Sequence, residues 1–255
     1  MKRLLILLLA SLLPNYAGAA IGLSNSGTNT TPADPLVITV SAAANDFLIA
    51  SISTDSSASP ASLTLGSPLV QDYTATSAVV DGMRFHAASG RASGSISSVS
   101  VSGFGAGAFR GIGAIAVFTG VDTTTALDTA VVTAADGGAA ANNTGNMIIT
   151  PVTAGTMLVM TAAFDQSGTT DPTFSVNDNG AGLSWTYVTS YEPAGFRKTM
   201  IGYAIAPSAA TYTLVGNFGL TGGFAAALYA LRPATGGGGG SSIPAIFRHL
   251  RQMKQ

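Results

Sequence analysis

The feature that most constrains this chain is an internal repeat, offset by about 110 residues, which implies two copies of one structural unit. An apolar segment, a short turn and a second apolar segment followed by aspartate occupy 36–55, and the same order returns at 147–165. Later in each half, an alternating segment precedes a phenylalanine and then a glycine-led apolar segment, at 97–118 and at 211–229. Because four segments match in the same order, we expect the two halves to share one fold.

Within each half, apolar and polar residues alternate with period two, as at Val99 and Val101, which is typical of strands with one face in a core. The body of the chain has no sustained helical stripe. The segments that begin at Phe47 and Met157 are almost wholly apolar, so we expect them to be central strands buried on both faces. In the second half the pattern predicts seven strands, at 147–150, 156–164, 173–177, 184–191, 198–206, 211–217 and 223–231.

Short strands separated by turn sequences such as Asp178-Asn179-Gly180 predict an antiparallel β-sandwich. The expected fold class is therefore all-β, with two tandem antiparallel sandwich repeats, Ig-like or jelly-roll-like, and a flexible C-terminal tail. The sequence leaves open whether the repeats are separate domains or one larger sandwich. The expected organisation is a signal peptide at 1–19, repeat 1 at 34–128, a connection at 129–145, repeat 2 at 146–233, a Gly/Ser linker at 234–242 and a short basic tail at 243–255.

The N-terminus has the plan of a secretory signal peptide. Lys2 and Arg3 precede an apolar run that ends before Pro14, and the small residues at 17–20 offer a cleavage site after Ala19. The apolar run is about half of the roughly 20 residues that span a bilayer. We therefore expect a secreted, extracellular or cell-surface protein, with the periplasm as a second location and an uncleaved anchor as the alternative to cleavage.

The C-terminus changes composition abruptly. The glycines at 236–240 are typical of a flexible linker, and Pro244 then opens a short, basic, amphipathic segment. Such a segment is too short to be a stable helix in water, so it would fold on a partner protein or an anionic membrane surface. The alternative is a frayed terminus without a role. The residues expected to form the attachment are Ile246, Phe247, Arg248, Leu250 and Arg251.

The charge of the body disfavours nucleic acids as partners. The chain has 11 Lys and Arg residues and 12 Asp and Glu residues. Five of the basic residues lie in the signal peptide and the tail, whereas all acidic residues lie between Asp34 and Glu192, so the body has an excess of negative charge. An acidic body offers no broad basic face to a phosphate backbone. The chain has no cysteine, so its stability must come from burial and not from disulfides.

One passage resembles a known type of sequence. The residues at 117–128 read V-F-T-G-V-D-T-T-T-A-L-D, an F-x-G-V-D-x-T…L-D pattern that follows an alanine-rich strand. This pattern is similar to that of tandem β-sandwich repeat proteins from bacterial surfaces and phage particles, and the similarity extends over about 35–232. The resemblance implies an adhesive or structural role, and the signal peptide favours the bacterial-surface branch. The second half departs at the matching point, where Leu231-Arg232-Pro233 replaces the Gly-Val-Asp turn.

The residues needed for catalysis are scarce. The chain has two histidines, no cysteine, one glutamate and no Gly-x-Ser-x-Gly elbow. We therefore expect a protein that is not an enzyme and has no cofactor, and a hydrolase with an Asp-based site is the third-ranked function. Calcium is the one inorganic ligand considered, with candidate ligands Asp165, Asp171 and Asp178. Against calcium, Asp-Asn-Gly is already explained as a turn.

Glycan binding is the second-ranked function. Trp185, Tyr187 and Tyr191 lie at i, i+2 and i+6, so they share one face of a regular strand. If that face points outward, the three rings form a platform for a sugar; if it points inward, they belong to the core. The end loops of the second repeat are the other candidate glycan site. The leading expectation is an exported structural or adhesive protein of a cell surface or a particle, able to self-assemble or to bind a surface partner.

Overall fold

A computed structural model describes residues 20–33, 35–55, 63–76, 82–103, 111–136, 142–165, 170–192 and 197–235. These residues form sixteen strands, all paired antiparallel, and contain no helix, so the prediction of an all-β protein is confirmed. The described part of the chain accordingly contains no apolar helix of bilayer-crossing length. The predicted signal peptide, most of the linker and the predicted attachment tail lie outside the described residues.

The strands alternate with turns throughout both halves. Those of the first half are β1 (Gly22–Ala33), β2 (Leu36–Ala42), β3 (Phe47–Asp55), β4 (Thr64–Leu65), β5 (Leu69–Thr76), β6 (Met83–Ala92), β7 (Ile96–Ser102) and β8 (Gly111–Thr119). Those of the second half are β9 (Val132–Asp136), β10 (Met147–Ile149), β11 (Thr156–Asp165), β12 (Ser175–Asn177), β13 (Thr186–Glu192), β14 (Arg197–Ala206), β15 (Tyr212–Asn217) and β16 (Gly223–Leu231).

The strands form two large and two small sheets. The large sheets have the orders β1-β8-β3-β6-β5 and β9-β16-β11-β14-β13, and the small ones have the orders β2-β7-β4 and β10-β15-β12. Adding eight to every strand number of the first half gives the strand number at the same place in the second half. The two halves therefore have the same topology, which is the arrangement that a sequence repeat requires.

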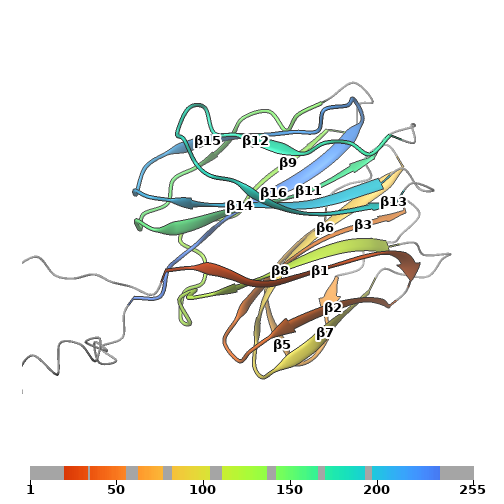
Figure 1. The fold of residues 1–255 in the computed structure, drawn as a ribbon, viewed down its shortest axis with the longest axis horizontal. Helices are drawn as coiled ribbons and strands as arrows, with labels where there is room; N and C mark the ends of the chain where they lie inside the picture. Colours follow the sequence, from red (N-terminus) through yellow and green to blue (C-terminus); the bar gives the residue numbers. More distant parts are fainter. Residues whose placement is uncertain are drawn as a thin grey trace, which may run out of the picture.

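The four sheets stack as small, large, large and small layers with three cores between them, and Figure 1 shows the strands of the second half lying over those of the first. The central core lies between the large sheets and includes Phe47, Phe118, Ile201 and Tyr229. Each outer core lies between a large sheet and the small sheet of the same half. The central core therefore contains residues of both halves.

The middle strands of the large sheets are buried on both faces. In β3, Phe47 and Ile49 enter the central core, whereas Leu48 and Ile52 enter the outer core of the first half. In β11, Met157 and Leu158 divide in the same way. These alternating contacts explain why both segments are apolar in sequence without a polar face. The expectation of central strands buried on both faces is confirmed.

Each of the seven ranges predicted as strands in the second half overlaps one strand, with ends that differ by at most two residues. Two further strands lie where none was expected. β9 lies inside the segment read as a connection, where it pairs with β16, and β1 precedes the expected start of repeat 1, where it pairs with β8. Both are edge strands of large sheets, so their sequences did not need the apolar character of the inner strands.

Candidate functional site

The resembling passage at 117–128 forms the main polar connection between the two halves. After β8, residues 120–128 run alongside residues 230–234, which leave β16, and we call these two segments the clasp. Its backbone hydrogen bonds run from Asp122 N to Arg232 O at 2.9 Å, from Arg232 N to Ala126 O at 2.8 Å and from Ala234 N to Gly120 O at 2.8 Å. Isolated bridges also pair Val121 with Pro233 and Leu127 with Leu231. The start of the inter-repeat passage is thus held against the end of the second half.

Asp128 is the centre of the clasp. Its side chain is fully buried, and its carboxylate accepts hydrogen bonds from Val152 N at 2.6 Å, Thr153 N at 2.8 Å, Thr153 Oγ1 at 2.7 Å and Thr156 Oγ1 at 3.3 Å. Arg232 Nε also donates to it at 2.9 Å. A buried carboxylate is stable only when its oxygens are satisfied in this way. Asp128 therefore joins the inter-repeat passage, the turn before β11 and the end of β16.

The electrostatics of the clasp favour ionised aspartates. Burial acts to raise the pKa of Asp128, but the hydrogen bonds from Thr153, Arg232 and Val152 outweigh it, and the pKa is lowered. The pKa of Asp122 is also lowered, mainly because its carboxylate accepts the backbone N–H groups of Thr125 and Thr124, each at 2.8 Å. Both carboxylates act as hydrogen-bond acceptors within the fold.

The glycine of the pattern has a steric role. Gly120 has φ of +73°, and a Cβ at this position would lie 2.6 Å from the carbonyl oxygen of Ala20. Only glycine adopts that backbone conformation at such a close approach without strain. Arg91 then fixes the next residues by donating to Asp122 O at 2.5 Å and to Asn45 O at 2.7 Å. The glycine and the aspartates of this passage therefore have structural roles in the clasp.

The three candidate calcium ligands lie in separate environments. Asp171 is paired with Lys198 at 2.7 Å, and Asp165 ends β11 opposite Arg197 and Gly223. Asp178 accepts the N–H groups of Gly180 and Leu183 within the predicted turn, where Asn179 and Gly180 have φ of +52° and +83°. No group of three or more His, Cys, Asp or Glu residues that could hold a metal ion occurs in the described ranges.

The three candidate sugar-binding aromatics are half-buried, not exposed. Trp185 packs against the outer core of the second half. Tyr187 makes an edge contact with Phe174 at 5.5 Å between ring centroids, and its hydroxyl accepts the Val176 N–H at 3.0 Å. Desolvation and nearby Asp171 raise the pKa of Tyr191. The structure therefore places the ring of Tyr187 against the small sheet of its own half.

Several buried polar groups could not be assigned from the sequence. Arg197 and Glu192 form an ion pair at 2.9 Å with both side chains almost fully buried. Ser51 Oγ donates to Ala162 O at 3.0 Å and joins the two large sheets directly. His86 is fully buried in β6, where its Nε2 lies 3.2 Å from Thr54 Oγ1. Glu192 and Arg197 are five positions apart, whereas the partners of Ser51 and His86 lie 111 and 32 positions away, so the sequence offered no local sign of these contacts.

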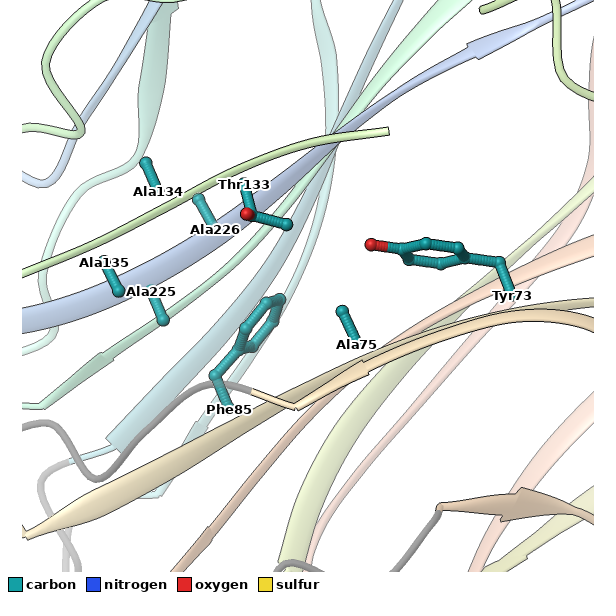
Figure 2. Close-up of a pocket in the computed structure, with 8 residues that line it drawn as sticks. All are labelled: Tyr73, Ala75, Phe85, Thr133, Ala134, Ala135, Ala225 and Ala226. Carbon is teal, nitrogen blue, oxygen red and sulfur yellow. The ribbon is translucent and has the colours of Figure 1, made fainter. Parts of the chain in front are cut away.

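The hollows that the described residues line include two larger ones. One is a cavity of about 330 Å³ at the open edge of the central core (Figure 2), lined by Tyr73, Ala75, Phe85, Thr133, Ala134, Ala135, Ala225 and Ala226. The other is a polar pocket of about 390 Å³ between the loops at one end of the second half, lined by residues 178–181, 207–208 and 210–213. Neither was predicted as a pocket, although the end loops had been named as a candidate glycan site.

No family model, no curated protein and no solved structure matches the chain. The resemblance inferred from the sequence pattern therefore stays a prediction.

Proposed function

We propose that the protein is an exported, non-enzymatic structural or adhesive module of a cell surface or a particle, built from two tandem β-sandwich repeats that pack large sheet against large sheet. The identical strand order of the two halves supports a duplicated sandwich. The largely apolar core that they share supports a rigid unit and not two mobile domains. A rigid body between a predicted export signal and a predicted attachment tail suits a protein that presents a surface.

The observation that carries this proposal is the use of charged side chains as internal connections. Asp128 pairs with Arg232, Glu192 with Arg197 and Asp171 with Lys198. Each pair joins two segments of the fold. The paired side chains thus have a structural role, and structural ion pairs are an alternative to catalysis for charged groups in a protein. These six charged side chains of the described residues therefore form structural contacts within the fold.

Cell fractionation tests this proposal. The full chain with a small epitope inserted after Ala209, an exposed loop residue, would be expressed in a bacterial host. We expect the epitope to reach protease added to intact cells. A variant truncated after Thr235 should be released to the medium if the tail attaches the protein. Retention of both forms in the cytoplasm would contradict export, and equal surface retention of both would contradict attachment by the tail.

The polar end-loop pocket favours glycan binding as the second candidate function. Its lining combines Asn179, Thr211 and Thr213 with the backbone of the Asp178 turn, and such groups can hydrogen-bond to sugar hydroxyls. A panel of polysaccharides titrated against the full chain tests this candidate, with Thr213→Val as the pocket variant and Thr119→Val as an exposed control that does not line the pocket. Binding that is weakened by the first change alone would support a glycan site, whereas no binding by any member would remove it.

A further inference from the structure

The cavity at the edge of the central core has a floor and walls from four strands. Phe85 of β6 forms its buried floor, and Ala75 of β5 lies beside that ring (Figure 2). Ala225 of β16 and Ala135 of β9 come from the large sheet of the other half. The volume of about 330 Å³ is within the range of small-molecule sites in proteins. The hollow therefore belongs to both halves and exists only because they pack together.

The opposite edge of the same core is closed, so the cavity lies only at the edge formed by β5 and β9. At the closed edge, β1 and β13 approach closely enough for Ser190 Oγ to donate to Asn29 O at 3.2 Å. At the cavity edge, the facing strands β5 and β9 offer alanines, whose side chains are too short to fill the space between the sheets. Interiors normally close such gaps, since unfilled apolar space reduces stability. An open gap with a buried aromatic floor thus needs an explanation.

The polar groups of the cavity lie at one end. Figure 2 shows the Tyr73 hydroxyl pointing across the cavity toward Thr133. Burial raises the pKa of Tyr73, so its phenol stays protonated at neutral pH and can donate a hydrogen bond. The rings of Tyr73 and Tyr229 also pack edge to face, with 5.5 Å between their centroids.

Tyr229 provides an independent sign of a missing partner. Its side chain is fully buried, and its hydroxyl finds no hydrogen-bond partner within the described part of the chain. Burial of an unpaired hydroxyl is unfavourable, so such groups call for a specific reason. The Tyr229 ring contacts the ring of Tyr73, whose side chain lines the cavity. An acceptor bound at this end of the cavity would therefore lie near both phenol groups.

We propose that this cavity binds a small, uncharged, mainly apolar molecule that carries a hydrogen-bond acceptor. The apolar part would lie on Phe85 between Ala75 and Ala135, and the acceptor would face the Tyr73 hydroxyl. The described residues that line the cavity include no charged side chain, so a charged ligand would lose its hydration without compensation. This ligand site is separate from the structural role and from the glycan pocket at the end loops.

Acetophenone and ethylbenzene are suitable probes because they have similar shapes and only the ketone has an acceptor. We expect NMR titration of the full chain to shift the amide signals of Thr133 and Ala225 with both probes, and the ketone to bind about fivefold more tightly. Absence of shifts at these amides with both probes would overturn the proposal. Equal affinity for the two probes would overturn the assigned role of the acceptor.

Two variants and a control locate the binding. Ala135→Leu places a larger side chain from an exposed edge strand into the cavity, so it should weaken both probes by at least about tenfold. Tyr73→Phe should remove the preference for the ketone and leave ethylbenzene binding unchanged. Ala209→Leu, the same enlargement at an exposed loop residue, should bind as the wild type does. Unchanged binding in a folded Ala135→Leu variant would place the probes elsewhere and refute the site.

Discussion

The Asp128 carboxylate and the Arg232 guanidinium meet at 2.9 Å although they are 104 positions apart in the chain. The first residue lies where the chain enters the second half, and the other lies where it leaves β16. Their contact therefore holds the first and the last segment of the second half together. The same carboxylate holds the turn before β11, so one side chain sets the position of three segments.

Replacement of Asp128 by Asn should destabilise the protein by about 3 kcal/mol, because a buried charged acceptor is lost and an amide group faces the donors of Val152 and Thr153. Urea unfolding followed by circular dichroism measures this change. Asp72→Asn is a control at an exposed aspartate and should change the stability by no more than about 0.5 kcal/mol. A similar small effect at both positions would show that the clasp does not stabilise the fold.

Acid should destabilise the fold in the range set by His86. Burial, with a contribution from Arg84, lowers the pKa of His86 to about 4, below its ordinary value of 6.5. The unfolded chain therefore binds a proton at a higher pH than the folded chain does, so stability is complete above about pH 6.5 and falls as the pH is lowered to about 4. The loss from this residue should reach about 3 kcal/mol, and below pH 4 the protonation of Asp128, whose pKa is lowered, should add to it.

Unfolding free energies at pH 7, 5 and 4 test this assignment. A His86→Gln variant should have a smaller loss of stability between pH 7 and 4 than the wild type. His249→Gln changes the other histidine of the chain and should keep the wild-type pH dependence. The assignment fails if the pH dependence follows His249 instead.

A methyl group at Gly27 should separate β1 from β2. A Cβ at this position would lie 2.1 Å from the carbonyl oxygen of Thr39, and backbone atoms cannot rotate away as a side chain can. Gly27→Ala should therefore reduce the stability by at least about 2 kcal/mol. Gly94→Ala meets no atom within 4 Å and should be neutral or slightly stabilising, by about 0.5 kcal/mol. Thermal unfolding of both variants gives the comparison.

The shared core predicts that the halves unfold together. Phe118 of the first half packs edge to face on Tyr203 of the second, at 5.6 Å between ring centroids. Phe118→Ala should cost about 4 kcal/mol of stability. Trp185 is the only tryptophan and lies in the second half, so its fluorescence should report a shifted transition although the substitution is in the first half. An unchanged Trp185 transition would mean that the halves unfold independently.

The sequence predicted the inner strands because their burial leaves a pattern that is local. The segments at Phe47 and Met157 are apolar on both faces, and those at 99–101 and 211–215 alternate, so their elements could be located without knowledge of their partners. The turn at Asn179 was readable for the same reason, since its positive φ is a property of neighbouring residues.

The edge strands and the sites depend on contacts that are distant in sequence. β1, with the sequence GLSNSGTNTTPA, has exposed and half-buried residues and is held by backbone pairing with β8, so its composition resembles that of a loop. The burial of His86 and the hydrogen bonds of Asp128 come from several strands at once. The cavity arises from alanines of both halves, and an alanine in sequence does not indicate whether its neighbours leave space beside it.

The position of β16 has a mechanical consequence. The chain leaves the body through this strand, which is hydrogen-bonded along both sides, to β11 and to β9, and it is followed at once by the clasp. A pull applied beyond Thr235 would first load the Arg232 contacts and then shear two ladders of hydrogen bonds together, instead of opening one edge bond after another. The end from which the linker extends is therefore built to bear tension.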